Sequence, residues 1–227
     1  MCKVLAESWS RRQFVAGLSA AGLVGGMGWT GRAAFAQTAM TGDAALHELA
    51  AGNERYAAGK LTSFAEDLEI LKAKTVNKQE PFAGVLSCAD SRVPVEIIFD
   101  QSINHLFVCR VAGNLVTPEI MASMEYGVAV LGIKAILVMG HTNCGAIGAA
   151  VQVKEVPGQI SALYQHMMPG IGDANGDVGK AVRLNAGFQA RVLRESSTVI
   201  SKAVKEKGVK VAAGVYDLGT GRVTMLS

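Results

Sequence analysis

The sequence predicts an α/β fold in which a mostly parallel central β-sheet is flanked by helices. Short apolar runs alternate with longer stretches of helical spacing along most of the chain. Strands that are separated by helices pair in parallel through right-handed crossovers. The chain has 227 residues, half of them hydrophobic, and shows no repeats or low-complexity tracts. It is therefore long enough to bury one core, and we expect one domain after an amino-terminal leader.

The first half of this domain contains two predicted helices and two predicted strands. Apolar side chains recur every three and four residues in 43–59, and Asp43 is the predicted N-cap of this helix. Residues 63–76 have the pattern of a second amphipathic helix. Residues 82–87 and 106–111 are short apolar runs that are typical of strands.

The second half continues the alternation. Three helices are predicted from spacing and capping: 118–131, with Thr117 as N-cap and a proline at the first position, 144–153, and 177–207 with a break within 195–198. Three strands are predicted from apolar runs: 134–140, 209–215 and 223–226. A Gly-Thr-Gly turn at 219–221 joins the last two strands.

The first 36 residues have the features of an export signal. Arg11 and Arg12 precede an apolar run rich in Gly and Ala at 16–29, and Ala34-Phe35-Ala36 follows as a cleavage site. The paired arginines resemble a bacterial twin-arginine signal. The run has about 14 residues, whereas a membrane span needs roughly 20 strongly apolar ones. We expect the twin-arginine export machinery to deliver the protein to the periplasm or outside the cell. Cleavage after Ala36 would leave a domain of residues 37–227 with no membrane span.

The net charge of +3 comes from this leader. The first 36 residues hold four basic side chains and one acidic one, so residues 37–227 carry 18 of each sign. A near-neutral domain has no general basic field, and nucleic-acid binding by such a field is excluded.

Two short segments hold the residues from which we predict the chemistry. Cys88-Ala89-Asp90-Ser91-Arg92 follows the strand at 82–87, and His141-Thr142-Asn143-Cys144 follows the strand at 134–140. The carboxyl ends of parallel strands meet at one edge of a sheet, where open α/β folds bind their ligands. Two thiolates, an imidazole and a carboxylate are a workable tetrahedral zinc set. The pair of segments therefore predicts a metal or reactive-thiol site.

A single cysteine or histidine in a sequence more often has a structural role than a metal-binding one. We therefore interpret the cysteines and histidines outside the two segments as structural. Cys109 lies within a predicted strand and is interpreted as structural. His47, His105 and His166 have no partner motif and are interpreted as solvated or core residues. Arg92 can bind the Asp90 carboxylate through two hydrogen bonds, which would leave the fourth metal position open. Alternatively, Asp90 binds the metal and closes the site.

At this point the sequence resembles a known family, the β-class carbonic anhydrases. The resemblance rests on the two segments above and on four more motifs across nearly all of the domain: Gly52-Asn-Glu-Arg-Tyr56, Leu106–Asn114, Ser123-Met-Glu-Tyr126 and Tyr216–Gly221. The chain departs from the family in having Tyr56 where Phe is common, and Asn104-His105 where Gly-Asp is common.

The resemblance implies one zinc ion per subunit, held by Cys88, His141 and Cys144. Asp90 would be a fourth ligand in a closed state, and the partner of Arg92 in the active one. Zinc-bound hydroxide, oriented by the Asp90–Arg92 pair, would attack CO2, and bicarbonate and a proton would be released. No motif identifies the proton shuttle.

The resemblance also implies a substrate pocket and an assembly. Gln79, Phe107 and Tyr126 match substrate-binding positions of the plant-like, open-site subtype. Val85 stands where the other subtype has a tryptophan of its non-catalytic bicarbonate site. Family members form dimers or multiples of dimers with pockets at the subunit interface, so a homo-oligomer is expected. Three alternatives stay open: a related zinc hydrolase of COS or CS2, a non-catalytic periplasmic zinc-binding protein, and a redox thiol protein using Cys88 and Cys144.

Overall fold

The computed structural model describes residues 38–63 and 68–226. The predicted export signal and its cleavage site lie outside the described residues. Within the described part of the chain, no helix combines the length and apolar character that crossing a bilayer requires.

One five-stranded sheet organises the domain, in the order β2-β1-β3-β4-β5. The strands are β1 Ala83–Ser87, β2 Leu106–Arg110, β3 Ala135–His141, β4 Lys210–Tyr216 and β5 Val223–Leu226. Neighbours from β2 to β4 are parallel, and β5 is antiparallel to β4. The predicted mostly parallel sheet is thereby confirmed, and each predicted strand is present to within a residue or two.

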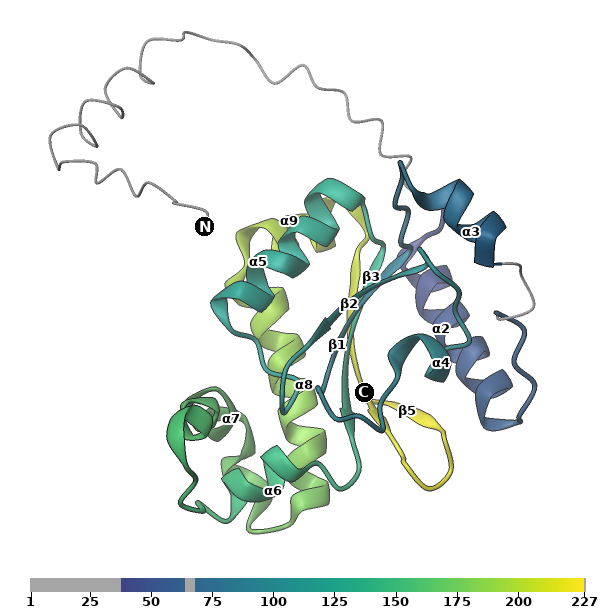
Figure 1. Cartoon of the computed structure of the whole chain (residues 1–227). Helices are drawn as coiled ribbons and strands as arrows, with labels where there is room; N and C mark the ends of the chain where they lie inside the picture. Colours follow the sequence, from purple (N-terminus) through teal and green to yellow (C-terminus); the bar gives the residue numbers. More distant parts are fainter. Residues whose placement is uncertain (1–37, 64–67, 227) are drawn as a thin grey trace, which may run out of the picture. The chain divides into compact units, whose positions relative to one another are not determined.

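Helices cover both faces of the sheet (Figure 1). On one face, Val85 and Leu137 pack with residues of the helices α2 Gly42–Ala57 and α4 Val95–Ile98. On the other face, Leu86 and Val138 pack with residues of α5 Pro118–Tyr126, α8 Val178–Ser196 and α9 Thr198–Lys207. Because β1 and β3 are covered on both faces, all of their residues are buried, and they appear in the sequence as continuous apolar runs.

The amino-terminal helices differ from the prediction at their ends. The N-cap of α2 is Thr41 and not Asp43, because the Thr41 hydroxyl accepts the N–H of Ala44 at 3.1 Å. Asp43 lies in the first turn, where its charge interacts favourably with the helix dipole. The helix predicted at 63–76 is observed as α3 Leu68–Thr75, and residues 64–67 lie outside the described part.

The helices of the second half follow the capping signals. Thr117 caps α5 as predicted, and a π-helical turn, Gly127–Leu131, continues it to the predicted end. The break in the long helix falls at Ser197, whose hydroxyl caps α9 by accepting the N–H of Ile200 at 3.0 Å. Cys144 is the N-cap residue of α6 Gly145–Val151. The prediction omitted α4, α7 Tyr164–Ile171 and the 3-10 turns on either side of α7, Gly158–Leu163 and Gly172–Ala174.

The strand order creates a switch point between β1 and β3. From β1 the chain passes to β2 on one side, and from β2 it crosses to β3 on the other side of β1. The loops after β1 and β3 therefore begin on either side of this switch point, at the carboxyl ends of the strands, which is where open α/β sheets bind ligands.

Candidate metal centre

The two predicted segments meet at this switch point. Cys88 directly follows β1, and His141 is the last residue of β3. Ser87 lies opposite Met139 in the parallel pairing, so β3 extends two residues beyond the end of β1 and His141 lies beside the loop that begins with Cys88. Asn143 has a φ of 54°, and this left-handed residue turns the chain sharply from β3 into α6, at whose start Cys144 lies.

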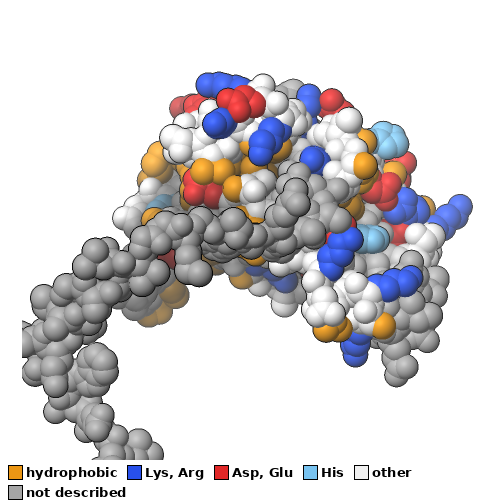
Figure 2. Space-filling view, turned by 90° about the horizontal axis from the view of Figure 1, so that it is seen from above, with side chains coloured by type: hydrophobic (Ala, Val, Ile, Leu, Met, Phe, Trp, Pro, Cys, Tyr) orange, Lys and Arg blue, Asp and Glu red, His pale blue; other side chains and the backbone are white. Residues whose placement is uncertain are grey.

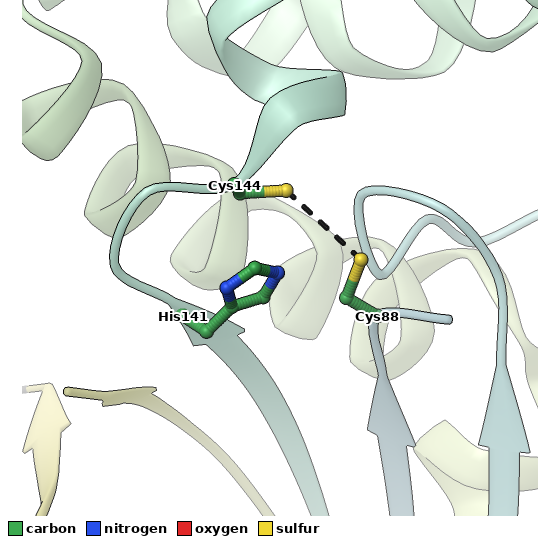
Figure 3. A group of neighbouring side chains, drawn as sticks. All are labelled: Cys88, His141 and Cys144. Atoms are coloured by element: carbon green, nitrogen blue, oxygen red, sulfur yellow. Dashed lines mark hydrogen bonds between the residues drawn. The ribbon is translucent and has the colours of Figure 1, made fainter. Parts of the chain in front are cut away.

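The side chains of Cys88, His141 and Cys144 converge (Figure 3). Their potential ligand atoms all lie within 4.8 Å of one another, and the two sulfur atoms are 4.0 Å apart. Two thiolates on a tetrahedral zinc ion, each at about 2.3 Å, lie about 3.8 Å from each other. All three residues are buried, with exposures of 4%, 0% and 2%. The group therefore has the dimensions and the donor atoms of a zinc site.

The hydrogen bonding of His141 orients one ring nitrogen toward the cysteines. Nδ1 lies 2.9 Å from the carbonyl oxygen of Thr142. A carbonyl only accepts, so Nδ1 carries the hydrogen and Nε2 keeps its lone pair. Nε2 is buried and has no hydrogen-bond partner among the described residues. A metal-ligating histidine has this arrangement, with its second nitrogen held by a carbonyl.

The surroundings of Cys88 favour its thiolate. The hydrogen bond from the Cys144 thiol lowers the pKa of Cys88, and the N–H of Gly113, 3.3 Å from the sulfur, acts in the same direction against the effect of burial. The pKa of Cys144 is raised, because this thiol keeps its hydrogen while it donates to Cys88. These contacts favour the thiolate at Cys88, and the thiolate is the form of cysteine that binds a metal.

Asp90 lies at the edge of the cluster and faces Arg92. Its Oδ1 accepts the backbone N–H and the Nε–H of Arg92, both at 2.9 Å, and its Oδ2 accepts from Nη2 at 2.7 Å. These bonds hold the pKa of Asp90 well below its usual range. Oδ2 is also 3.8 Å from Nε2 of His141. Arg92 Nη2 donates to the carbonyl of Asn143 at 3.3 Å, so the guanidinium joins the two loops.

The residues predicted to bind substrate lie elsewhere in the chain. Phe107 pairs with Gly84, four residues before Cys88, which corresponds to about 13 Å along a strand. Its ring lies beside that of Tyr126, with centroids 6.3 Å apart, and Tyr126 is 42% exposed. Gln79 is exposed and precedes β1, at the end of the strand opposite to Cys88. A single chain therefore does not bring these three residues to the cluster.

Among the residues that the structure describes, the remaining cysteine and the other histidines lie outside this cluster. Cys109 is in the core, and burial raises the pKa of its thiol. His47 and His105 are exposed, and His166 is half-buried. Prediction from the sequence did not assign a role to Arg110, whose side chain donates to the backbone of the first segment. Its signals in the sequence were its place in the motif Leu106–Asn114 and its position at the end of a predicted strand.

The fold and the site together define an α/β protein with a cysteine–histidine cluster, able to hold a metal ion, at the carboxyl edge of its sheet. A family model described as carbonic anhydrase matches residues 83–223. The chain is 33% identical over 194 residues to a carbonic anhydrase of Mycolicibacterium smegmatis, covering 81% of this chain and 93% of that one. It is 30% identical over 190 residues to carbonic anhydrase 2 of Mycobacterium tuberculosis, covering 80% and 91%.

Solved structures agree with these relatives. A tetrameric β-carbonic anhydrase of Sordaria macrospora matches with a TM-score of 0.64 and 26% identity, over 80% of this chain and 96% of that one. A Coccomyxa β-carbonic anhydrase in complex with acetazolamide matches with a TM-score of 0.57 and 29% identity, over 80% and 81%. The chain belongs to the β-class carbonic anhydrase family, and it is an enzyme of that class.

Proposed function

We propose that this protein catalyses the zinc-dependent, reversible hydration of CO2 to bicarbonate and a proton. The observation that carries the proposal is the buried, unpartnered Nε2 of His141, which points at two cysteine sulfurs beside the Asp90–Arg92 pair. Storage of zinc does not require the carboxylate–guanidinium pair, and thiol redox chemistry requires neither this pair nor the oriented imidazole.

Three side chains hold the metal in this proposal: Cys88, His141 and Cys144. Zinc, when bound, supplies a Lewis acid that lowers the pKa of water and makes a hydroxide nucleophile available near neutral pH. The chain contributes a buried, preorganised ligand set on the ends of two adjacent strands. The Cys88 thiolate is favoured before the metal arrives, so fewer protons must leave on binding.

Asp90 orients the nucleophile. Its carboxylate is ionised because Arg92 donates to both oxygens, and Oδ2 lies on the side of the His141 ring. The free lone pairs of Oδ2 can accept the hydrogen of a hydroxyl group and aim its oxygen at CO2. Arg92 keeps the carboxylate in place and neutralises it. This is the open form, and the absence of a tryptophan at Val85 supports the assignment to the plant-like subtype.

A second copy of the chain completes the substrate pocket. Gln79 and Tyr126 are exposed, and in one chain they lie away from the cluster. Their predicted contact with substrate requires that a partner chain brings them to it, so the active unit is a dimer or a multiple of dimers. The structural relative from Sordaria macrospora is tetrameric.

The precursor is exported by the twin-arginine machinery and cleaved after Ala36, and the domain of residues 37–227 works in the periplasm or outside the cell. The paired arginines support this route, as does the concentration of the net charge in the leader. Figure 2 shows basic and acidic side chains interspersed on one face of the described domain. A route that carries folded proteins would also allow the thiols to bind metal before export.

Stopped-flow CO2 hydration by the purified protein, before and after chelation, tests the activity, together with zinc content. We expect one zinc ion per chain and a loss of hydration on chelation that zinc restores. Stoichiometric zinc without hydration would contradict the proposal, and hydrolysis of COS or CS2 in its place would point to the related hydrolases. Full zinc and full activity in Cys88→Ser would contradict the assignment of the ligands.

A further inference from the structure

Arg110 connects the edge strand β2 to the loop that carries Cys88 and Asp90. It is the last residue of β2 and lies opposite Ser87 in the strand pairing, so its backbone is held by the sheet. Its Nε donates to the carbonyl oxygen of Cys88 at 2.9 Å, and its Nη2 donates to the carbonyl oxygen of Asp90 at 2.6 Å. One guanidinium thus binds two carbonyls of the loop, a geometry that its planar fork allows and a lysine cannot reproduce.

The two arginines divide the control of Asp90 between them. Arg92 binds the carboxylate, whereas Arg110 binds the backbone carbonyl of the same residue. The Asp90 carbonyl also accepts the N–H of Val93 at 3.1 Å, so the loop backbone is held at this residue from two sides. Substitution of Arg110 would free the backbone without removing any group that binds the Asp90 side chain.

The backbone position matters because the carboxylate is close to ligand distance. Oxygen and nitrogen ligands of a tetrahedral zinc ion, each at about 2.05 Å, lie about 3.3 Å apart. Asp90 Oδ2 is 3.8 Å from His141 Nε2. The carboxylate thus lies beside His141 but outside the group of three converging ligand atoms, and a movement of the loop backbone would change its distance from them. A loop in this place needs an anchor if the fourth metal position is to stay open.

We propose that Arg110 is a positioning residue that holds the Cys88–Asp90 loop so that the Asp90 carboxylate stays on Arg92 and off the metal. The inference rests on the proposed zinc site, and it adds a residue that selects between the open and the closed form. Arg110 itself acts through Asp90 and needs no contact with substrate.

Anion binding to the cobalt-substituted full-length protein tests this role. Thiocyanate can bind the metal only while the fourth position is open, and its binding is measured from the visible spectrum of Co²⁺. If loss of the anchor leaves about one tenth of the molecules open, the apparent thiocyanate affinity falls about tenfold. We expect this fall in Arg110→Gln, with one Co²⁺ per chain retained. Arg194→Gln is the matched control, because Arg194 is an exposed arginine that pairs with Glu195, and it should bind thiocyanate as the wild type does.

A double-mutant cycle separates positioning from general damage. In an Asp90→Ala background no carboxylate is left to close the site, so adding Arg110→Gln should leave thiocyanate affinity unchanged. Arg110→Lys should show a smaller loss of thiocyanate affinity. If Arg110→Gln does not retain cobalt, the thiocyanate affinity of Arg110→Lys tests the role in its place. Wild-type affinity in both Arg110 variants, or an equal loss with and without Asp90, would overturn the role. A wild-type protein that binds no metal would overturn the proposed function itself, and this role with it.

Discussion

Replacing Asp90 with asparagine tests the Asp90–Arg92 pair most directly. The substitution keeps the shape of the side chain but exchanges one accepting oxygen for a donating NH2 group. In the structure both carboxylate oxygens accept from Arg92, one from Nε and the other from Nη2. An amide can accept only one of these bonds. Whichever way the amide is placed, its NH2 group faces a nitrogen donor of Arg92, and in one of the two placements the NH2 group also lies on the side of His141.

We expect Asp90→Asn to impair catalysis and to leave metal binding intact. Asp90 is outside the group of three residues whose ligand atoms converge, so Asp90→Asn should retain one zinc ion per chain. Loss of a positioned hydrogen-bond acceptor should lower kcat/KM for CO2 hydration by about a hundredfold, at the lower end of the effect of such groups. This corresponds to about 2.7 kcal/mol of transition-state stabilisation. Stopped-flow hydration and metal analysis of the same samples provide both numbers.

Asp173→Asn is the matched control, because Asp173 is an exposed aspartate of a 3-10 turn outside the cluster. It should hydrate CO2 at the wild-type rate. A value of kcat/KM within twofold of the wild type in Asp90→Asn, at full zinc occupancy, would refute the role of the carboxylate. Loss of zinc in that variant would instead show that Asp90 is a ligand in the resting protein.

Three further predictions concern the ligands, the fold and the assembly. Cys144→Ser should lower zinc affinity at least tenfold and lower activity in proportion, since a serine hydroxyl is a poor substitute for a thiolate. Competition with a chelator measures the affinity, and an unchanged affinity would contradict the ligand set. Asp100→Ala should lower the free energy of unfolding by about 3 kcal/mol at pH 7, because this buried carboxylate accepts from Arg55, Thr62 and Ser63. Burial alone would raise the pKa of Asp100, but these donors outweigh it and lower the pKa. The contribution of Asp100 to stability is therefore complete above the unfolded pKa of about 3.9 and is lost as the pH falls below it. In urea unfolding, the difference in unfolding free energy between wild type and variant should shrink in acid, and a constant difference would contradict this. Tyr126→Ala should weaken self-association or raise KM without loss of zinc, measured by analytical ultracentrifugation and kinetics, and no change in either would exclude Tyr126 from a pocket shared between chains.

The sequence was sufficient for the sheet because its central strands are covered on both faces. β1 and β3 need continuous apolar residues, and such runs stand out between helical segments. The convergence of Cys88, His141 and Cys144 followed from the same logic, since side chains at the carboxyl ends of neighbouring parallel strands meet at one edge. Thr117 before Pro118 identified the start of α5 for a local reason, because both residues favour the first turn.

Other features depend on contacts that no local pattern contains. Thr41 and Asp43 can both cap a helix, and the structure selects Thr41. A four-residue helix such as α4 is too short to show periodicity, and α7 contains Pro169, which normally indicates a break. The π-helical turn after α5 lies where Gly127 approaches Phe107 and Ile133, and a side chain there would be crowded. The substrate-binding role of Gln79 depends on a second chain and stays a prediction.

The arrangement of the site separates holding the metal from giving access to it. The three predicted ligands are buried. They lie directly after β1, at the end of β3 and at the start of α6, so their spacing is determined by strand pairing in the middle of the sheet. Asp90, in contrast, is positioned by Arg92 and Arg110, both of which are exposed residues. A change at either arginine can therefore move the carboxylate while the ligand set stays intact. Variants of these arginines should consequently alter anion access and turnover at constant metal content, whereas variants of the ligands should alter all three together.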